Sequence, residues 1–247
     1  MNVMDKRIDQ MGCILGEDGI PDCSQASFAR TMRASPLWKD VMHLAVRRSV
    51  PRGTVVMPAG EQVNALYYVE QGEVRIDMHA PGGMEKIFCY IGPDCLFGES
   101  PFFLEKPYFL SATCVQPTVL QVFTREVLNE KIFPKSPELV QELFRALAFK
   151  LQVLINQIAL LGMDPMVVRV CKYLRLNLSR DAEGRLYSVP GIPQHELANL
   201  LGMHRVSCNR ILKGLEKDGV ISEYSPERVW IYREDVILNA GMDLPCG

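Results

Sequence analysis

The order of small, apolar and polar residues between Ile192 and Leu212 constrains this chain more than any other stretch. Counted from Gln194, a small residue, Ala198, stands at position 5 and a glycine, Gly202, at position 9. A small residue is needed where a second helix crosses the first, and glycine lets the turn between them take a positive φ. The remaining inward positions are apolar: Leu197, Leu201, Met203, Cys208 and Ile211. The spacing predicts a helix-turn-helix.

The residues left on the outside of this unit suit contact with nucleic acid. At the start of the second helix they are His204, Arg205, Val206, Ser207, Asn209, Arg210 and, one turn later, Lys213. In a major groove, Arg205 and Arg210 are expected to donate to guanine or phosphate, and Val206 to touch a thymine methyl. Ser207 and Asn209 are expected to contact backbone or bases, while Gln194 and His195 hold phosphates at the start of the first helix. The alternative is a helical hairpin that only packs on a core.

Two short apolar stretches, 220–224 and 228–232, follow the second helix and are separated by turn residues. Gly219 can end that helix in a left-handed conformation, so the pattern predicts a β-hairpin and hence a winged helix over residues 164–247. Residues 200–217 hold four Lys/Arg against one Glu, although the chain has a net charge of −2. A local positive patch is sufficient for phosphate contacts, and double-stranded DNA is the expected partner.

Composition is that of an ordinary globular protein, with 48% hydrophobic and 23% charged residues among 247. No apolar leader and no run of eighteen apolar residues is found, so we expect a cytoplasmic protein with no membrane partner. The eight cysteines include no Cys-x-x-Cys pair, and no metal site is expected. Cys171 and Cys208 are expected in the core, whereas Cys13, Cys23 and Cys246 remain open as redox switches.

Between Thr54 and Phe123 the pattern changes to short apolar or alternating runs separated by glycine. The runs are Thr54–Met57, Leu66–Val69, Val74–Met78, Lys86–Ile91 and Thr118–Phe123, with turns expected at Gln71-Gly72 and Gly82-Gly83. Strands at this spacing predict an all-β roll or barrel. We place it at residues 36–133, after an N-terminal extension of residues 1–35.

A long helix is predicted over residues 134–163. Apolar residues recur along it with heptad spacing: Val140, Phe144, Leu147, Leu151, Leu154, Ile158 and Leu161. This seam favours pairing with the same helix of a second subunit, so a homodimer is expected. The seam could instead pack on the chain's own β domain, but a second stripe is predicted to serve that purpose: Leu143, Ala148, Ile155 and Ala159.

A β-roll, a long helix, a short hinge and a winged helix follow one another in this order in the Crp/Fnr superfamily. Residues 40–235 resemble that superfamily through Gly60-Glu61, Gly72-x-Val74 and Gly98-Glu99 in the roll and through Leu201–Leu212 in the helix-turn-helix. The resemblance implies an α+β fold with a cyclic-nucleotide-binding-like jelly roll. It also implies a homodimeric transcription regulator, expected to be an activator that meets RNA polymerase on palindromic DNA under the control of a small-molecule effector.

The chain departs from the superfamily where a ligand would bind. Members that bind cyclic nucleotides hold the phosphate with an Arg-Ser pair, and here Leu110-Ser111 stands at that place. A buried phosphate without a cation is unfavourable, so an effector other than cyclic AMP is expected. The iron–sulfur branch needs clustered N-terminal cysteines, and Cys13, Cys23 and Cys95 do not match that arrangement.

A partial resemblance to the halophenol-responsive regulators of reductive dehalogenation rests on Val206, Lys150 and a cysteine in the N-terminal segment. It implies an aromatic anion as effector, with Lys150 pairing a phenolate. The candidate effector-binding residues are Tyr67, Phe88, Gly98, Glu99, Phe102, Tyr108, Phe109, Ser111 and Lys150. The competing interpretation is that these rings simply fill a small roll.

Two other functions remain open. A redox-, haem- or nitric-oxide-sensing regulator of the same superfamily would use a cysteine, His43 or His79 as a ligand. A β-roll enzyme fused to a DNA-binding domain would need a metal cluster of histidines and a carboxylate, but only His79 falls inside the roll. Neither a catalytic residue nor a cofactor is therefore assigned from the sequence.

Overall fold

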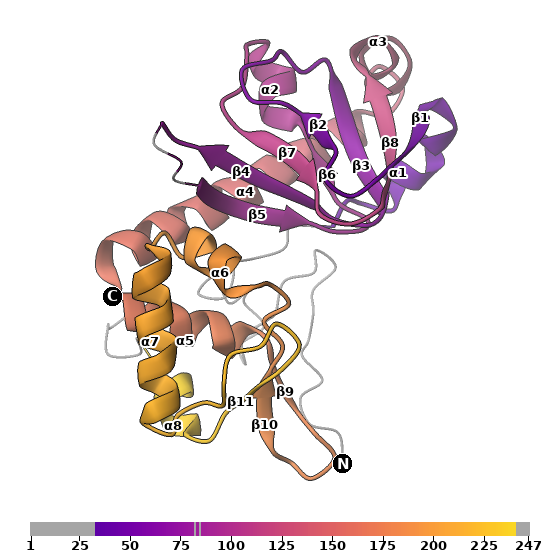
Figure 1. Cartoon of the computed structure of the whole chain (residues 1–247). Coiled ribbons are helices and arrows are strands. Elements are labelled where there is room, and N and C mark those ends of the chain that lie inside the picture. Colours follow the sequence, from indigo (N-terminus) through magenta and orange to yellow (C-terminus); the bar gives the residue numbers. More distant parts are fainter. Residues whose placement is uncertain (1–32, 82, 84, 241–247) are drawn as a thin grey trace. The chain divides into compact units, whose positions relative to one another are not determined.

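The computed structural model describes residues 33–81, 83 and 85–240 (Figure 1). The described residues divide into two compact units, one ending at Ile155 and the other beginning at Asn156. The division falls inside the long helix α4 (Pro137–Met163), earlier in the chain than residue 164, where the winged helix is predicted to begin.

Two antiparallel four-stranded sheets form the roll of the first unit. One has the order β1 (Val46–Val50), β8 (Thr118–Thr124), β3 (Ala65–Gln71) and β6 (Leu96–Phe97). The other has the order β2 (Val55–Met57), β7 (Ser111–Cys114), β4 (Val74–His79) and β5 (Glu85–Ile91). Buried residues of both sheets, among them Val69, Leu120, Val74 and Ile91, form one apolar cluster. The predicted β-roll is confirmed.

The strands that the sequence pattern did not reveal lack an apolar signal. Four of the five residues of β1 are exposed and its sequence is Val-Arg-Arg-Ser-Val, because it lies at a sheet edge. Strand β6 has two residues, and β7 consists mainly of small ones. The expected turn at Gly72 is present with φ +91, and a Cβ there would lie 2.5 Å from Thr118 Oγ1, so only glycine fits.

A second apolar cluster joins the outer side of the β8–β3 sheet to short helices. These are α1 (Leu37–Asp40), η2 (Met42–Leu44), α2 (Glu99–Leu104), α3 (Arg125–Val127) and η3 (Leu128–Ile132). Trp38, Phe102 and Phe123 are almost fully buried in this cluster, together with Leu139 and Leu143 from the start of α4. The first turns of α4 are thereby fixed to the roll.

Helix α4 has one buried and one exposed apolar side within the single chain. The buried apolar residues are Leu139, Leu143, Ala146 and Val153 in the first unit and Leu160 in the second. The stripe predicted to face the roll is therefore wrong apart from Leu143, because Ala148, Ile155 and Ala159 are exposed. The buried residues recur at spacings of three, four and seven, which keep them on one side of the helix, and these three residues lie off that side. By length and composition α4 could also cross a membrane, but a helix that pairs with a second copy has the same composition.

The second unit is helical with a small sheet. Its elements are α5 (Met166–Leu176), β9 (Leu178–Arg180), β10 (Leu186–Ser188), α6 (Gln194–Leu200), α7 (Arg205–Lys217), β11 (Val229–Trp230) and α8 (Glu234–Leu238). The sheet has the order β11-β10-β9. The predicted wing hairpin is thus only partly formed, since β11 pairs with β10 and touches the 220–224 stretch through one bridge, Ile221 to Ile231.

The side chain of Arg169 ties the end of α4 to the helix-turn-helix. Its guanidinium donates to the carbonyls of Leu161 at 2.7 Å, Asp164 at 3.0 Å and Leu201 at 3.3 Å. Leu161 also lies against the turn, because its Cδ2 is 2.7 Å from the position that a Cβ of Gly202 would take. The last turn of α4 is therefore part of the second unit.

Candidate nucleic-acid interface and effector region

Helices α6 and α7 form the predicted helix-turn-helix. Leu197, Ala198 and Leu201 are fully buried where the helices meet, and Gly202 has φ +62, as the turn requires. The backbone N–H of Val206 donates to Nδ1 of His204 at 3.3 Å, which caps the start of α7. Of the five predicted inward positions, Ile211 is only half-buried.

The residues predicted to contact DNA lie on the exposed side of this unit. The exposed ones are His195, His204, Arg205, Val206, Asn209, Arg210 and Lys213, while Gln194 and Ser207 are half-buried. Nε2 of Gln194 donates to Oδ1 of Asn209 at 3.2 Å, so the start of α6 is linked to the middle of α7. The nine residues therefore come from the two helices of one compact motif.

The charges on α7 differ in how far the protein itself neutralises them. Lys213 lies 2.8 Å from Glu216 and 3.8 Å from Glu223, and the hydrogen bond with Glu216 raises the pKa of Lys213. Within the described part of the chain, the side chains of Arg205 and Arg210 form neither an ion pair nor a hydrogen bond. Their guanidinium groups, exposed on the first half of α7, can accept an anionic partner.

A basic and aromatic cluster beside the sheet was not predicted. The guanidinium of the exposed Arg228 lies 4.6 Å from the ring centre of Tyr187 and 5.1 Å from that of Trp230. Arg185 lies 4.9 Å from the ring centre of Trp230. Stacking of this kind holds a guanidinium flat while its charge stays accessible. The only signal in the sequence is the alternation of Arg and aromatic residues at 228–230, and that pattern predicts a strand without indicating the stacking.

In the roll, Lys150 already has an anionic partner. Its Nζ lies 2.7 Å from both carboxylate oxygens of Glu99 and 3.0 Å from the carbonyl of Leu96. Glu99, at the start of α2 and almost fully buried, supplies the counter-charge, so an external anion would have to displace it, and the pairing of Lys150 with an effector stays a prediction. Gly98, directly before Glu99, has φ +92 and lies so close to Ala65 that a Cβ would come within 3.1 Å of its carbonyl.

The aromatic residues proposed for the effector fall into three different surroundings. Tyr67, Phe88 and Tyr108 are partly buried against the apolar cluster between the two sheets, and Tyr67 stacks on Phe97 at 4.8 Å between ring centres. Phe102 belongs instead to the second cluster, with Arg125 4.2 Å from its ring centre. Phe109 is 63% exposed. The structure therefore separates Phe102 from the other three, whereas Phe109 lies against Tyr108 with 5.0 Å between ring centres.

The stretch that would hold a cyclic phosphate is apolar. Leu110 is buried in the cluster between the sheets, and Ser111 accepts a hydrogen bond from the backbone of Ala59 through its Oγ at 3.2 Å. A guanidinium is therefore missing at Leu110, and the nearby Glu99 is already paired. These residues do not fit a cyclic nucleotide bound through an Arg-Ser pair.

The two histidines considered as haem ligands and the two cysteines predicted in the core lie in different surroundings. His43 and His79 are both exposed rather than set in an apolar cavity. Cys171 and Cys208 are buried as predicted, and burial raises the pKa of each thiol to about 11, which keeps them protonated. Cys13, Cys23 and Cys246 lie outside the described residues.

Comparison with known proteins agrees with this domain order. Residues 47–133 match the cyclic nucleotide-binding domain and residues 168–236 the Crp-like helix-turn-helix domain. The Cyclic AMP receptor protein of Thermus thermophilus is 32% identical over 77% of this chain and 89% of that protein. This chain belongs to the Crp/Fnr superfamily. A CRP-like cAMP-activated global transcriptional regulator of Mycobacterium tuberculosis is also 32% identical, over 69% of this chain and 77% of that protein.

Solved structures of the Crp/Fnr superfamily share the fold. CprK complexed with OCPA superimposes with a TM-score of 0.68 at 18% identity, over 86% of this chain and 97% of that chain. The c-di-GMP responsive regulator CLP of Xanthomonas campestris gives a TM-score of 0.68 at 23% identity, over 79% of this chain and 98% of that chain. The relatives are transcription regulators, and the second unit of this chain is a Crp-like DNA-binding domain.

Proposed function

We propose that this protein is a homodimeric transcription activator that binds palindromic DNA and responds to a small effector in its roll. The observation that carries the DNA-binding part is the pair Arg205 and Arg210, exposed at the start of α7 and without a counter-charge among the described residues. Val206 between them is 57% exposed and offers apolar contact to a thymine methyl. Arg228, stacked on Tyr187 and Trp230 of the small sheet, would add a phosphate contact outside the recognition helix.

Dimerisation is supported by the uncovered side of α4. Phe144, Leu151 and Ile158 are 68%, 58% and 71% exposed in the single chain and recur at heptad spacing. A twofold dimer would present two copies of α7 about 34 Å apart, one turn of DNA, when the effector favours that arrangement. RNA polymerase is the partner that an activator of this kind meets at the promoter.

The proposed effector is an aromatic anion rather than cyclic AMP. Two relatives carry cyclic AMP in their names, but Leu110 offers no charge to a phosphate. An anion that enters near Tyr67, Phe88 and Tyr108 would compete with Glu99 for the ammonium of Lys150. If the effector replaces Glu99 as the partner of Lys150, the contact that holds α4 to the roll changes. A ligand switch needs such a difference in contacts between the free and the bound state.

The test combines DNA selection with a ligand screen on the full-length protein. Selection from random DNA is expected to return a palindrome, and Arg205→Ala and Arg210→Ala should each lower affinity by at least about 1 kcal/mol. In a thermal-shift screen, chlorinated phenols and aromatic carboxylates should raise Tm and cyclic AMP should not. A cyclic AMP response would reject the effector assignment alone, whereas failure to select any DNA motif would reject the regulator itself.

A further inference from the structure

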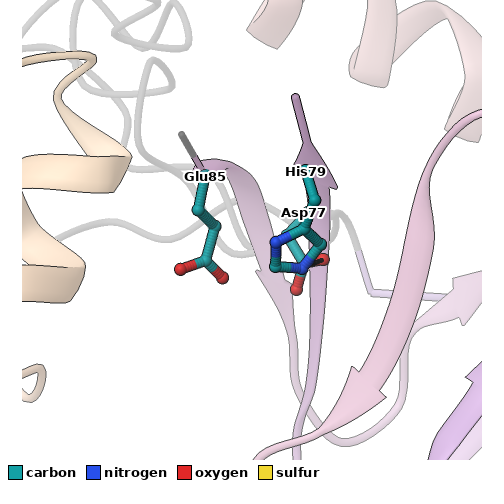
Figure 2. A group of neighbouring side chains, drawn as sticks. All are labelled: Asp77, His79 and Glu85. Atoms are coloured by element: carbon teal, nitrogen blue, oxygen red, sulfur yellow. Dashed lines mark ion pairs between the residues drawn. The ribbon is translucent and has the colours of Figure 1, made fainter. Parts of the chain in front are cut away.

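Three potential metal ligands gather where β4 ends and β5 begins. Asp77 and His79 come from β4 and Glu85 from β5, and their ligand atoms all lie within 4.8 Å of one another (Figure 2). The strand register explains this, because His79 pairs with Glu85 across the ladder and Asp77 precedes His79 by two residues, on the same side of β4. Two strands and three side chains thus point to one position.

One oxygen of the Asp77 carboxylate is placed as a metal ligand would be. Its side chain is fully buried, yet its Oδ1 has no hydrogen bond within the described structure. That oxygen lies 3.2 Å from Nε2 of His79, without the alignment of a hydrogen bond. Two ligands of one tetrahedral zinc ion, each about 2.0–2.1 Å from the metal, stand about 3.3 Å apart. The two atoms therefore have the separation of neighbouring ligands.

Arg75 orients the carboxylates and leaves the cluster negative. Its Nε donates to Asp77 Oδ2 at 2.8 Å, and its terminal nitrogen lies 2.7 Å from Glu85 Oε1. Asp77 and Glu85 supply two carboxyl groups against this one guanidinium, an excess of formal negative charge in the cluster. Such partners behind the ligands commonly fix metal sites.

We propose that Asp77, His79 and Glu85 bind a divalent transition-metal ion of the zinc type. One imidazole nitrogen and two carboxylates suit Zn²⁺, Mn²⁺ or Fe²⁺ and are a poor match for Mg²⁺ or Ca²⁺, which take oxygen ligands. The ligand atoms lie within 4.8 Å of one another, a bound wider than a closed site, so the proposal includes a small rotation of Glu85 that brings its carboxylate to the ion. The ion joins the ends of β4 and β5. No Cys-x-x-Cys or paired-histidine motif marks the site in the sequence.

The alternative is an ion-pair network in which protonated His79 and Arg75 balance the two carboxylates without a metal. Metal binding to the full-length protein separates these possibilities. Zn²⁺ binding is measured by titration calorimetry and by metal content after dialysis, and Co²⁺ provides a visible spectrum. His79→Gln and Glu85→Gln remove ligands, and His79 is exposed enough for this change to leave the fold intact. His43→Gln, an exposed histidine of the same unit, is the matched control.

One equivalent of metal is expected to bind the wild type and the His43→Gln variant equally. His79→Gln and Glu85→Gln should each weaken binding by at least about tenfold. The wild-type Co²⁺ spectrum should show visible ligand-field bands without thiolate charge transfer, since a thiolate band would assign the ion to cysteines and overturn the site. Equal binding by wild type and His79→Gln would also overturn it. Binding that appears only in Arg75→Gln would show that the guanidinium fills the position instead.

Discussion

The ammonium of Lys150 in α4 lies 2.7 Å from both carboxylate oxygens of Glu99 at the start of α2. Glu99 has 3% of its side chain exposed and Lys150 23%, so the pair is largely removed from water. The carbonyl of Leu96 takes a further bond from the same ammonium. This lysine therefore fastens the middle of α4 to the roll through a partner of opposite charge and a strand backbone at once.

Lys150→Met should destabilise the protein by more than the loss of the lysine's own hydrogen bonds. It leaves the Glu99 carboxylate buried and unpaired, for which a loss of about 3–5 kcal/mol in the free energy of unfolding is expected. The double variant Lys150→Met/Glu99→Gln should recover most of that loss, because the remaining amide is neutral. Urea unfolding of wild type, both singles and the double measures the coupling. A single variant as stable as wild type would mean that the pair contributes nothing.

Leu151→Glu together with Leu154→Glu should convert the dimer into monomers. These side chains are 58% and 41% exposed in one chain, and the proposed interface would place charges of equal sign in an apolar seam. Loss of two-site binding should weaken operator affinity by about 10²-fold or more. Light scattering reports the mass. Gln141→Glu adds a charge to an exposed polar position of the same helix and should remain dimeric; a dimeric double variant would contradict the seam.

Val206→Glu should change which base pair the protein prefers. A carboxylate accepts from cytosine N4, whereas valine contacts a thymine methyl, so preference should move toward G·C at one position per half-site by about 1–3 kcal/mol. Lys213→Gln, on the same helix, should lower affinity for all sequences alike and reduce the salt dependence. Selection from random DNA with the three proteins measures both effects. The same motif from Val206→Glu and wild type would exclude Val206 as a base reader.

Gly202→Ala and Gly214→Ala should have opposite effects on stability. Gly202 has φ +62 and lies against Leu161, so a side chain there is expected to cost about 1–2 kcal/mol and to disturb the turn between α6 and α7. Gly214 lies within α7 with no atom within 4 Å of its added Cβ, and alanine there should stabilise by about 0.5–1 kcal/mol. Thermal unfolding measures both. Equal shifts in the two variants would show that backbone conformation does not decide the outcome.

Asp94 should contribute to stability at neutral pH and lose that contribution in acid. The Tyr68 hydroxyl donates to Asp94 Oδ1 at 2.6 Å, and this bond, with Lys39, lowers the pKa of the carboxyl. Because the folded pKa is below the unfolded value of about 3.9, the stabilisation is present above that pH and disappears as the pH falls through the folded pKa. Asparagine also tolerates the positive φ of this position. In a plot of the free energy of unfolding against pH, Asp94→Asn should therefore lose less stability in acid than wild type or the exposed control Asp40→Asn.

Patterns within one element could be predicted from the sequence, and contacts between distant residues could not. The spacing of Ala198 and Gly202 specifies how two helices cross, so the helix-turn-helix was predicted with its outer face. Lys150 was predicted among the effector-binding residues of the roll, but its partner Glu99 is 51 positions away and only the packing of α2 brings them together. The stacking of Arg228 and the cluster of Asp77, His79 and Glu85 were not predicted for the same reason, since strand pairing brings those residues together.

The three carbonyl bonds of Arg169 have a practical consequence for dissecting this protein. They bind the last turn of α4 to the turn after α6, and the second compact unit accordingly begins at Asn156. A DNA-binding fragment cut at the hinge after Met163 would lack Leu161, leaving Gly202 uncovered and one Arg169 bond without its acceptor. Isolated DNA-binding fragments, and chimaeras that exchange DNA-binding domains within the superfamily, should therefore include the end of the long helix.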